Sequence, residues 1–509
     1  MNPLVEAMAL ALTASPSISL VAFYGIPTFV LALLYLLARR HRPKFALPCP
    51  PGPKSPNMPS LDPWVTYQEW GRVYGDLVYI QEMNMLIISS SQAAVDLLEK
   101  RARIYSDRET SSAIMVSQVD RIMSVQRYSN KWRRHRKFFH QSFRQSACSR
   151  FYPAQYRKIN DLLRNLAVTP EQFMQHTMAF SQSLMYATLY GLDIGSEDPL
   201  LRKAESVINT FGDLMFPGFP SLERFPWLRY MPSSFPGCGF QRVVKKFIQN
   251  LDDLDAIPFD RAVENLKNGA GTSLIAELAL EKPMEVDMIK AMGTTSFVAA
   301  SDTTTSSISS FLLTVTLHPE VQVKAQAEID RVIGRDRLPT FEDRKSLLYI
   351  EGIYREIMRL HPPGPLAINH VSTEDDFYNG YHIPKGCVVV PNIWAMNRDP
   401  NVYPDPDKFM PERYLDSPDG PFTNINDVYA FGFGRRVCVG RYMAENTVWL
   451  TIASIMATFD LCKAKDDGGD EIDIPEEYTQ TFFRHPKPYQ SCIKPRDQQA
   501  LELILRATE

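Results

Sequence analysis

Ten residues late in the chain constrain its fold more than any other segment. Residues 431–440 read FGFGRRVCVG. Gly432 and Gly434 can take the positive φ angles that a tight turn requires. Gly440 has no Cβ, so a flat ligand can lie close to the backbone there. These features predict a turn that presents Cys438 to a bound group.

A helix is expected directly after this turn. One apolar stripe runs from residue 441 onward, through Ala444, Val448, Thr451 and Ile455. Cys438 then lies at a helix N-terminus, where the dipole and the free N–H groups favour a thiolate. The alternative that these residues leave open is an inert, buried cysteine in a glycine-rich turn.

This segment resembles the haem-binding loop of the cytochrome P450 superfamily. The pattern F-x-x-G-x-R-x-C-x-G matches at every fixed position, namely Phe431, Gly434, Arg436, Cys438 and Gly440. The resemblance implies haem b as the cofactor and Cys438 as the ligand of its iron. It also implies that Phe431, Arg436 and Gly440 contact the haem. The expected fold is mainly α with a minor β part, as a large helical domain with a long central helix and a small β-rich domain.

Residues 286–317 are expected to form that central helix, and they contain AASDTT at 299–304. This resembles the family motif [AG]-G-x-[DE]-T. An acid beside a hydroxyl is suited to proton relay, and the resemblance implies that Asp302 and Thr303 deliver protons to bound dioxygen. Ala300 stands where glycine is usual, and the sequence leaves open whether its methyl group alters oxygen binding. The alternative is an ordinary helix whose hydroxyls bond back to carbonyls four residues earlier.

Two separate motifs resemble the charged lock of the family. Glu356 and Arg359 lie one helical turn apart, and Arg413 follows in a P-E-R segment. The resemblance implies a buried triad with a structural role. Taken alone, the first pair is typical of a weak, solvent-exposed ion pair.

Further residues are expected to hold the haem propionates. Trp132 and Arg136 form a W-x-x-x-R motif with both ends on one helix face. By resemblance, they bond a propionate together with His370 and Arg436, because a buried dianionic edge needs charged donors. For His370, a loop histidine with a purely local partner is the open alternative.

The N-terminal region is predicted to anchor the chain in a membrane. Residues 18–38 carry no charge, and a helix of that length crosses a bilayer core of roughly 30 Å. Arginines follow at once, which places the C-terminal side in the cytosol. The prediction is a lumenal segment at 1–17, a transmembrane helix at 18–38, and a basic, Pro-rich hinge at 39–62, in the endoplasmic reticulum membrane. A cleaved signal peptide is the alternative.

The rest of the chain is predicted to form one haem-thiolate catalytic domain over 63–496, followed by a C-terminal tail at 497–509. Residues 77–90 are expected to form paired strands, and short strands are expected over 477–493. Residues 216–237 are rich in Phe, Pro, Trp and Tyr. They are expected to form an apolar loop, not a helix, which either dips into the membrane or packs on the core.

The expected substrate is a lipophilic small molecule. The net charge of −3 argues against a nucleic-acid partner. The segments expected to line the pocket are largely apolar; they are 112–125, 211–215, 297–300, 363–368 and 481–483, with Met115, Phe211, Phe297, Leu366 and Phe482 prominent. Residues 483–489 resemble the fungal secondary-metabolite branch of the family, which suggests a terpenoid, polyketide or indole-type product.

The predicted activity is insertion of one oxygen atom from dioxygen, and it needs an electron donor. The chain has no flavin or iron–sulfur motif, so a separate NADPH-dependent flavin reductase is expected, with cytochrome b5 as a second candidate donor. Arg133, Lys137 and Arg435 are candidates for a basic docking patch. Two alternatives remain: a haem-thiolate isomerase or dehydratase that needs no reductase, and a non-catalytic haem-binding protein. The sequence identifies neither the substrate nor the site and number of oxidations.

Overall fold

The computed structural model describes residues 47–506, apart from residues 55, 60, 196–197, 216–218 and 416–428. The predicted membrane anchor at 18–38 therefore lies outside the described residues, as do its flanks up to residue 46. Among the residues that are described, no helix is both long enough and apolar enough to cross a bilayer. The chain divides into a small unit, Met1–Cys49 with Phe377–His382, and a large unit, Pro50–Asp376 with Ile383–Glu509.

A short hairpin accounts for much of what is described of the small unit. Strands β4 (Asp376–Tyr378) and β5 (Tyr381–Ile383) pair through a two-residue turn. The turn is Asn379-Gly380, with φ angles of 49° and 80°, as expected for a pair that tolerates the left-handed region. The N–H of His382 donates to the Pro48 carbonyl at 2.8 Å.

The large unit is mainly helical, as the sequence predicted. Its longer helices are α4 (Pro63–Tyr74), α8 (Asn130–Phe143), α9 (Tyr152–Val168), α10 (Phe173–Met185), α11 (Pro199–Met215), α13 (Phe240–Lys267), α14 (Leu274–Glu281), α15 (Val286–Leu317), α16 (Pro319–Val332), α17 (Leu348–Leu360), α19 (Arg441–Thr458) and α20 (Gln498–Arg506). Its shorter helices are α5 (Ser91–Ala94), η3 (Val95–Lys100), α6 (Ala102–Tyr105), α7 (Ser112–Ser117), α12 (Pro220–Arg224), η9 (Pro226–Tyr230) and α18 (Ile393–Met396).

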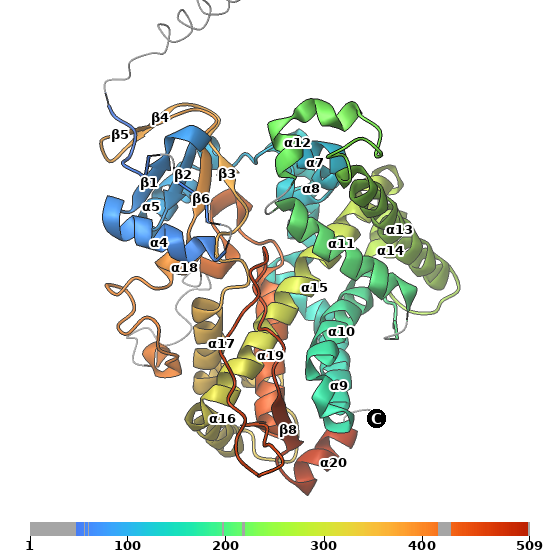
Figure 1. Ribbon diagram of the computed structural model, residues 1–509. Helices are drawn as coiled ribbons and strands as arrows, with labels where there is room; N and C mark the ends of the chain where they lie inside the picture. The colour runs from blue at the N-terminus through green and yellow to red at the C-terminus, as the bar shows by residue number, and fades with distance from the viewer. Residues whose placement is uncertain are drawn as a thin grey trace, which may run out of the picture. The chain divides into compact units, whose positions relative to one another are not determined.

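Helix α15 lies at the centre of the helical part (Figure 1). It packs against α10, α13, α17 and α19, and nearly all of its C-terminal half is buried. Many of its buried side chains are Ser and Thr, several of which donate to the carbonyl four residues earlier. The sequence predicted this helix with the same bounds.

One four-stranded sheet lies in the large unit, in the order β1-β2-β6-β3. The strands are β1 (Leu77–Ile80), β2 (Met85–Ile88), β6 (Val388–Pro391) and β3 (His370–Val371). The predicted strands within 77–90 are confirmed as β1 and β2, which pair antiparallel and are buried along their whole length. Strand β3 pairs His370 with Val389 of β6, and the sheet thereby fixes the position of His370.

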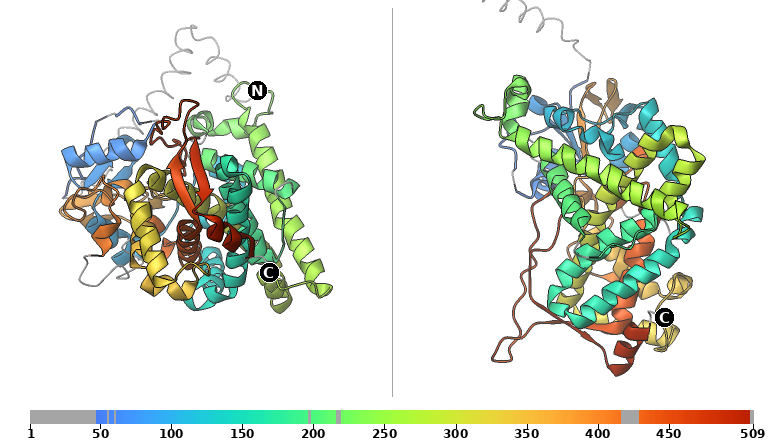
Figure 2. Two further views of the ribbon diagram at one scale, coloured as in Figure 1. Left: turned by 90° about the horizontal axis from the view of Figure 1, so that it is seen from below. Right: turned by 90° about the vertical axis from the view of Figure 1, so that its right-hand side faces the viewer.

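The strands expected over 477–493 are largely absent from the described chain. Only β8 (Ser491–Pro495) forms there, and it pairs antiparallel with β7 (Phe459–Lys463). The residues between them, 464–490, are called the closing segment below. This segment runs back along the outside of α15 (Figure 2), and Ile474 and Tyr478 pack on Leu313 of that helix.

Three further expectations need correction. Residues 216–237 contain two short helices, α12 and η9, where a loop was expected. Most of the predicted tail forms α20, which packs on α9 and α19 with Ile504 fully buried. Part of the predicted hinge belongs to the folded body, because the Pro51 carbonyl accepts a hydrogen bond from Tyr79 of β1 at 2.9 Å.

Candidate functional site

The glycine-rich turn before α19 is held by backbone hydrogen bonds. The N–H of Cys438 donates to the Phe431 carbonyl at 2.8 Å. Gly432 and Gly434 take φ angles of 72° and 55°, the left-handed conformation that the sequence predicted. A Cβ at Gly434 would lie 2.1 Å from the Leu98 carbonyl oxygen. Gly434 is therefore required both by the turn and by the close packing of η3.

The Cys438 thiol is surrounded by protein on all sides, but part of its surface is in contact with no other atom. Burial raises its pKa above the ordinary value, whereas the Gly440 N–H, Arg136 and Arg441 act in the opposite direction. The helix terminus alone was expected to favour the thiolate, but in the protein as described burial outweighs it. The Cys438 side chain is still exposed. A group that is both enclosed and exposed must face an internal space.

Two other positions border open space in the interior. A Cβ at Gly440 would meet no atom within 4 Å, although Gly440 directly precedes the buried helix α19. Ala299 is exposed and Ala300 is half-buried in the middle of α15, where the residues just before them, such as Val298, are buried. The interior therefore has room for a ligand beside the cysteine turn and beside the centre of α15.

Arg436 connects the cysteine turn to α8. Its guanidinium carbon lies 4.2 Å from the ring centroid of Trp132, which is buried. Arg436 donates through Nε to the Ser106 carbonyl at 2.9 Å and through Nη2 to the Gln126 carbonyl at 2.7 Å. The remaining nitrogen, Nη1, is buried without a hydrogen-bond partner among the described residues.

Arg108 is a buried cationic residue that the sequence motifs did not indicate. It donates through Nη1 to the carbonyls of Ile368 and Asn369, at 2.5 and 2.7 Å, and through Nε to that of Ser124 at 2.9 Å. His370 lies nearby, and its Nδ1 donates to the Tyr105 carbonyl at 2.7 Å. No motif pointed to Arg108, because its partners are backbone carbonyls, two of them about 260 residues away.

Arg108, Arg436 and His370 form a basic cluster with little negative charge nearby. Burial and the neighbouring cation Arg436 lower the pKa of Arg108. Burial lowers the pKa of Arg436 to about 9, with Arg136 adding to the effect, and burial together with Arg108 depresses the pKa of His370. Asp107, the nearby carboxylate, is bound by Arg127 and by the Tyr128 N–H. Asp107 raises the pKa of both arginines but offsets only part of their charge. Buried cations with too little negative charge are costly, so the cluster suits an anionic ligand.

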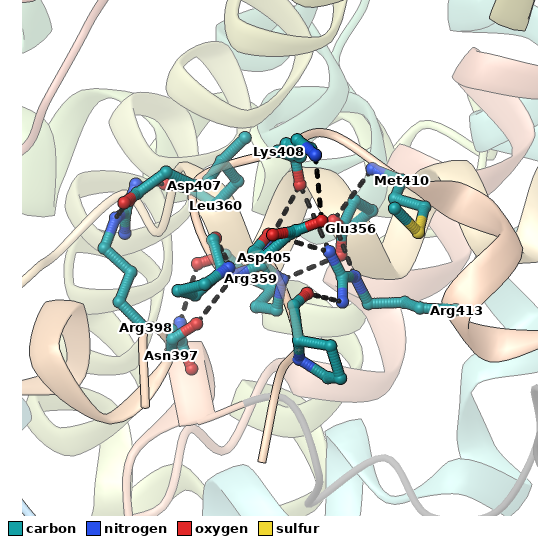
Figure 3. A network of polar contacts seen from close by, with 12 residues as sticks. Glu356, Arg359, Leu360, Asn397, Arg398, Asp405, Asp407, Lys408, Met410 and Arg413 are labelled. Atoms are coloured by element: carbon teal, nitrogen blue, oxygen red, sulfur yellow. Dashed lines mark hydrogen bonds and ion pairs between the residues drawn. The ribbon is translucent and has the colours of Figure 1, made fainter. Parts of the chain in front are cut away.

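The predicted charged triad is present and buried (Figure 3). Arg359 donates to both oxygens of Glu356 at 2.8 Å, and Arg413 donates to Oε1 at 2.9 Å. The side chains of the three residues are 0, 1 and 8% exposed for Glu356, Arg359 and Arg413. Arg359 also donates to the Asn397 and Pro406 carbonyls, both at 2.7 Å. The triad thus ties α17 to the loop over residues 397–413.

Asp302 and Thr303 project from the centre of α15 and are half-buried. The Thr303 hydroxyl donates to the Ala299 carbonyl at 2.8 Å, the local bond that the alternative interpretation expected. Asp302 Oδ1 lies 2.9 Å from His485 Nε2 of the closing segment. The sequence motif indicated the acid and the hydroxyl but gave no sign of this histidine.

The residues expected to line a substrate pocket are not all in open positions. Phe211 of α11 and Phe482 of the closing segment meet edge to face, with centroids 6.3 Å apart. Phe297 is buried against Tyr186. Met115 is exposed and lines a cavity of about 380 Å³, and the other residues of that cavity include the charged side chains Asp120, Arg127 and Lys131.

Comparison with known proteins assigns this chain to a family. The family model described as Cytochrome P450 matches residues 54–493. The chain belongs to the cytochrome P450 family. A cytochrome P450 of zebra fish, in a structure with progesterone, superposes with a TM-score of 0.70 at 21% identity and covers 86% of this chain and 100% of its own. The mainly helical architecture is therefore the cytochrome P450 fold.

The similar curated relatives are fungal cytochrome P450 enzymes. Cytochrome P450 monooxygenase COX1 of Coprinopsis cinerea is 37% identical over 480 residues, which is 89% of this chain and 92% of the relative. Tryptamine 4-monooxygenase of Psilocybe cyanescens is 34% identical, covering 93% of this chain and 97% of its own. This chain is thus a cytochrome P450 monooxygenase of the fungal branch.

Haem b is the cofactor of cytochrome P450 enzymes, and the residues present fit it. An enclosed thiol faces internal space, and a Cβ at Gly440 would enter that open region. The cluster of Arg108, Arg436 and His370 has one nearby carboxylate, Asp107, which already binds Arg127, and Arg436 Nη1 has no partner among the described residues. A thiolate-ligated iron and a dianionic porphyrin edge satisfy these features together.

Proposed function

We propose that this cytochrome P450 is an NADPH-reductase-dependent monooxygenase that oxidises a lipophilic small molecule in natural-product biosynthesis at the endoplasmic reticulum membrane. The observation that carries the proposal is Cys438, a thiol enclosed by protein yet open to internal space. The name of one relative, tryptamine 4-monooxygenase, supports an indole-type substrate, and terpenoid and polyketide substrates fit the same class.

In this proposal the residues around the cysteine turn hold the cofactor. When bound, haem supplies the activation of dioxygen. Cys438 would ligate the iron, and the Gly440 N–H donates to its sulfur. Phe431 and Gly440 would contact the haem. Trp132, Arg136, His370 and Arg436 would hold the propionates. Arg108 would join them, because it belongs to the same basic cluster.

Asp302 and Thr303 are proposed to deliver protons. Thr303 must release the Ala299 carbonyl before its hydroxyl proton can point into the internal space. Its oxygen can accept a hydrogen bond in either arrangement. The Asp302 carboxyl donates a proton and is then reprotonated. The methyl group of Ala300, where glycine is usual, is compatible with proton delivery, because Ala300 is only half-buried.

A basic surface next to the cysteine turn supports docking of an acidic electron donor. Arg133 and Arg435 both lie over the ring of Tyr128, at 5.6 and 5.4 Å. Arg435 and Gly434 also line a cavity of about 300 Å³ together with Lys100, Arg103 and one acidic residue, Glu99. An excess of positive charge steers a partner of opposite charge. The proposed donor is the NADPH-dependent flavin reductase, with cytochrome b5 as a second donor.

The membrane location is proposed from two features. Residues 18–38 have the length and apolarity of a transmembrane helix. A second surface, at α12 and η9, exposes Phe225, Trp227, Tyr230 and Phe235, at 41–72%. Amphipathic aromatic rings suit the interface between water and lipid. A lipophilic substrate dissolved in the same membrane would be within reach.

Oxygen-isotope labelling tests the proposal. Microsomes containing this chain and a fungal reductase are incubated with extracts of the host lipids under ¹⁸O₂, with and without NADPH. The expected result is an NADPH-dependent product that carries one ¹⁸O atom. A product that forms without reductase and NADPH, and without label, would instead identify an isomerase or dehydratase.

A further inference from the structure

The acid at the centre of α15 has a partner from a distant part of the chain. His485 Nε2 lies 2.9 Å from Asp302 Oδ1, and the two side chains are 21 and 18% exposed. Among the described residues, His485 is the side chain within hydrogen-bond distance of Asp302. The contact joins the centre of α15 to the closing segment, where no regular helix or strand holds the chain.

The backbone around His485 is fixed on both sides. One turn along α15 from Asp302, the Ser306 hydroxyl donates to the Arg484 carbonyl, so two positions on one helix face hold neighbouring residues of the closing segment. The Arg484 N–H donates to the Pro363 carbonyl at 2.9 Å. The His485 N–H donates to Thr479 Oγ1 at 3.0 Å, and the Thr479 N–H donates to the His485 carbonyl at 2.7 Å. The imidazole is therefore presented to Asp302 from an anchored position.

We propose that His485 is a positioning residue for Asp302. Its Nε2–H donates to Oδ1, which restricts the carboxyl to one rotamer and leaves Oδ2 free to exchange protons. A half-buried aspartate without this donor would sample several rotamers, and a misplaced proton donor lowers the rate of the reaction it serves. This inference rests on the proton-delivery role proposed for Asp302.

Substitution of His485 tests the proposal through the coupling of NADPH use to product. His485→Phe removes the donor, whereas His485→Gln retains an N–H at a similar reach. Lys487→Gln is the matched control, because it breaks the exposed Lys487–Glu477 pair of the same segment, 2.8 Å apart, and does not touch α15. We expect His485→Phe to lower product per NADPH by about tenfold and to enlarge the solvent hydrogen-isotope effect. The Gln variant and the control stay within about twofold of the parent.

A thermal double-mutant cycle tests the contact without using activity. The unfolding temperatures of the holoenzyme are compared for Asp302→Asn, His485→Phe and the double variant. If the pair interacts, the second substitution adds little once the first is present, with single shifts on the order of 1–2 °C. Additive shifts would overturn the contact. If the Phe variant fails to fold, His485→Leu replaces it.

The outcomes separate this inference from the proposed function. If Asp302→Asn leaves product per NADPH unchanged, the role proposed for Asp302 is wrong. If Asp302→Asn lowers it and His485→Phe does not, the positioning role of His485 alone is wrong. If the Gln variant is as impaired as the Phe variant, a hydrogen-bond donor is not sufficient, and the positioning role is likewise overturned.

Discussion

The guanidinium of Arg436 stacks on the indole ring of Trp132, 4.2 Å from its centroid. This contact joins the cysteine turn to α8 across 304 residues of sequence (436 − 132). It holds the guanidinium over an apolar ring, and Nη1 is buried without a hydrogen-bond partner among the described residues. The geometry leaves one N–H group of a buried cation available to an anionic ligand.

Removing this cation is expected to weaken haem binding. Arg436→Gln takes a charged donor from the basic cluster, and loss of one partner in a buried charge pair costs about 2–5 kcal/mol. The ratio of haem absorbance to protein absorbance after purification should fall, and haem should transfer to apomyoglobin faster. Arg435→Gln is the control, since Arg435 is exposed and bonds Tyr128. Equal haem retention in the two variants would contradict the assignment of Arg436.

The charged triad predicts a large loss of stability. Glu356→Gln leaves Arg359 and Arg413 buried without their carboxylate, which costs about 3–5 kcal/mol. Denaturant unfolding of the haem-bound protein would measure the loss. Lys100→Gln breaks the exposed pair with Asp96, 2.7 Å apart, and should leave the midpoint unchanged. A small effect at Glu356 would mean that the triad does not lock the loop over residues 397–413.

Much of the fold could be predicted from the sequence, because local periodicity decides it. The bounds of α15 follow from a long apolar pattern, and β1 and β2 follow from β-branched runs. The helices α12 and η9 do not follow from composition, because a segment rich in Phe, Pro, Trp and Tyr predicts a loop. Pro220 and Pro226 each occupy the first turn of a short helix, where proline is favoured. The strands over 477–493 were overestimated because β8 depends on pairing with β7, which a local pattern does not reveal.

The candidate site could be predicted only at residues that belong to a sequence motif. The motif around Cys438 and the pair Asp302-Thr303 could be read from adjacent residues. Arg108 and His485 could not, since Arg108 bonds carbonyls about 260 residues away and His485 contacts Asp302 across 183 residues (485 − 302). Long-range contacts of this kind leave no spacing pattern in a single sequence.

The two glycines of the cysteine turn should differ in their tolerance of alanine. Both have positive φ, which costs an alanine roughly 1–2 kcal/mol. A Cβ at Gly432 would meet open space, but at Gly434 it would lie 2.1 Å from the Leu98 carbonyl oxygen. Gly434→Ala should therefore be less stable than Gly432→Ala by about 1–3 kcal/mol. Denaturant unfolding of the two purified variants measures this, and equal midpoints would contradict the close approach of η3.

A buried histidine on α8 should contribute to acid sensitivity. Burial, together with Lys131 and Arg134, lowers the pKa of His135 to about 4, while Glu285 acts in the opposite direction. The unfolded chain then binds the proton more tightly than the folded one. Stability from this group is complete above about pH 6.5 and declines as the pH falls toward 4, by at most about 1.4 kcal/mol per pH unit.

His135→Phe should flatten that decline. The free energy of unfolding is measured between pH 4 and 7 for the parent, His135→Phe and the exposed control His140→Phe. His361 and His370, whose pKa values are also lowered by burial, retain their share of the slope in every variant. An unchanged slope in His135→Phe would show that His135 is not held neutral in the folded protein.

The carbon monoxide difference spectrum of the reduced protein tests the central claim most directly. If the Cys438 thiolate ligates haem iron, the parent gives the red-shifted Soret band of thiolate ligation. Cys438→Ser then loses that band together with the NADPH-dependent product. A Cys438→Ser protein that keeps both the band and the product would contradict the assignment of Cys438 as the iron ligand.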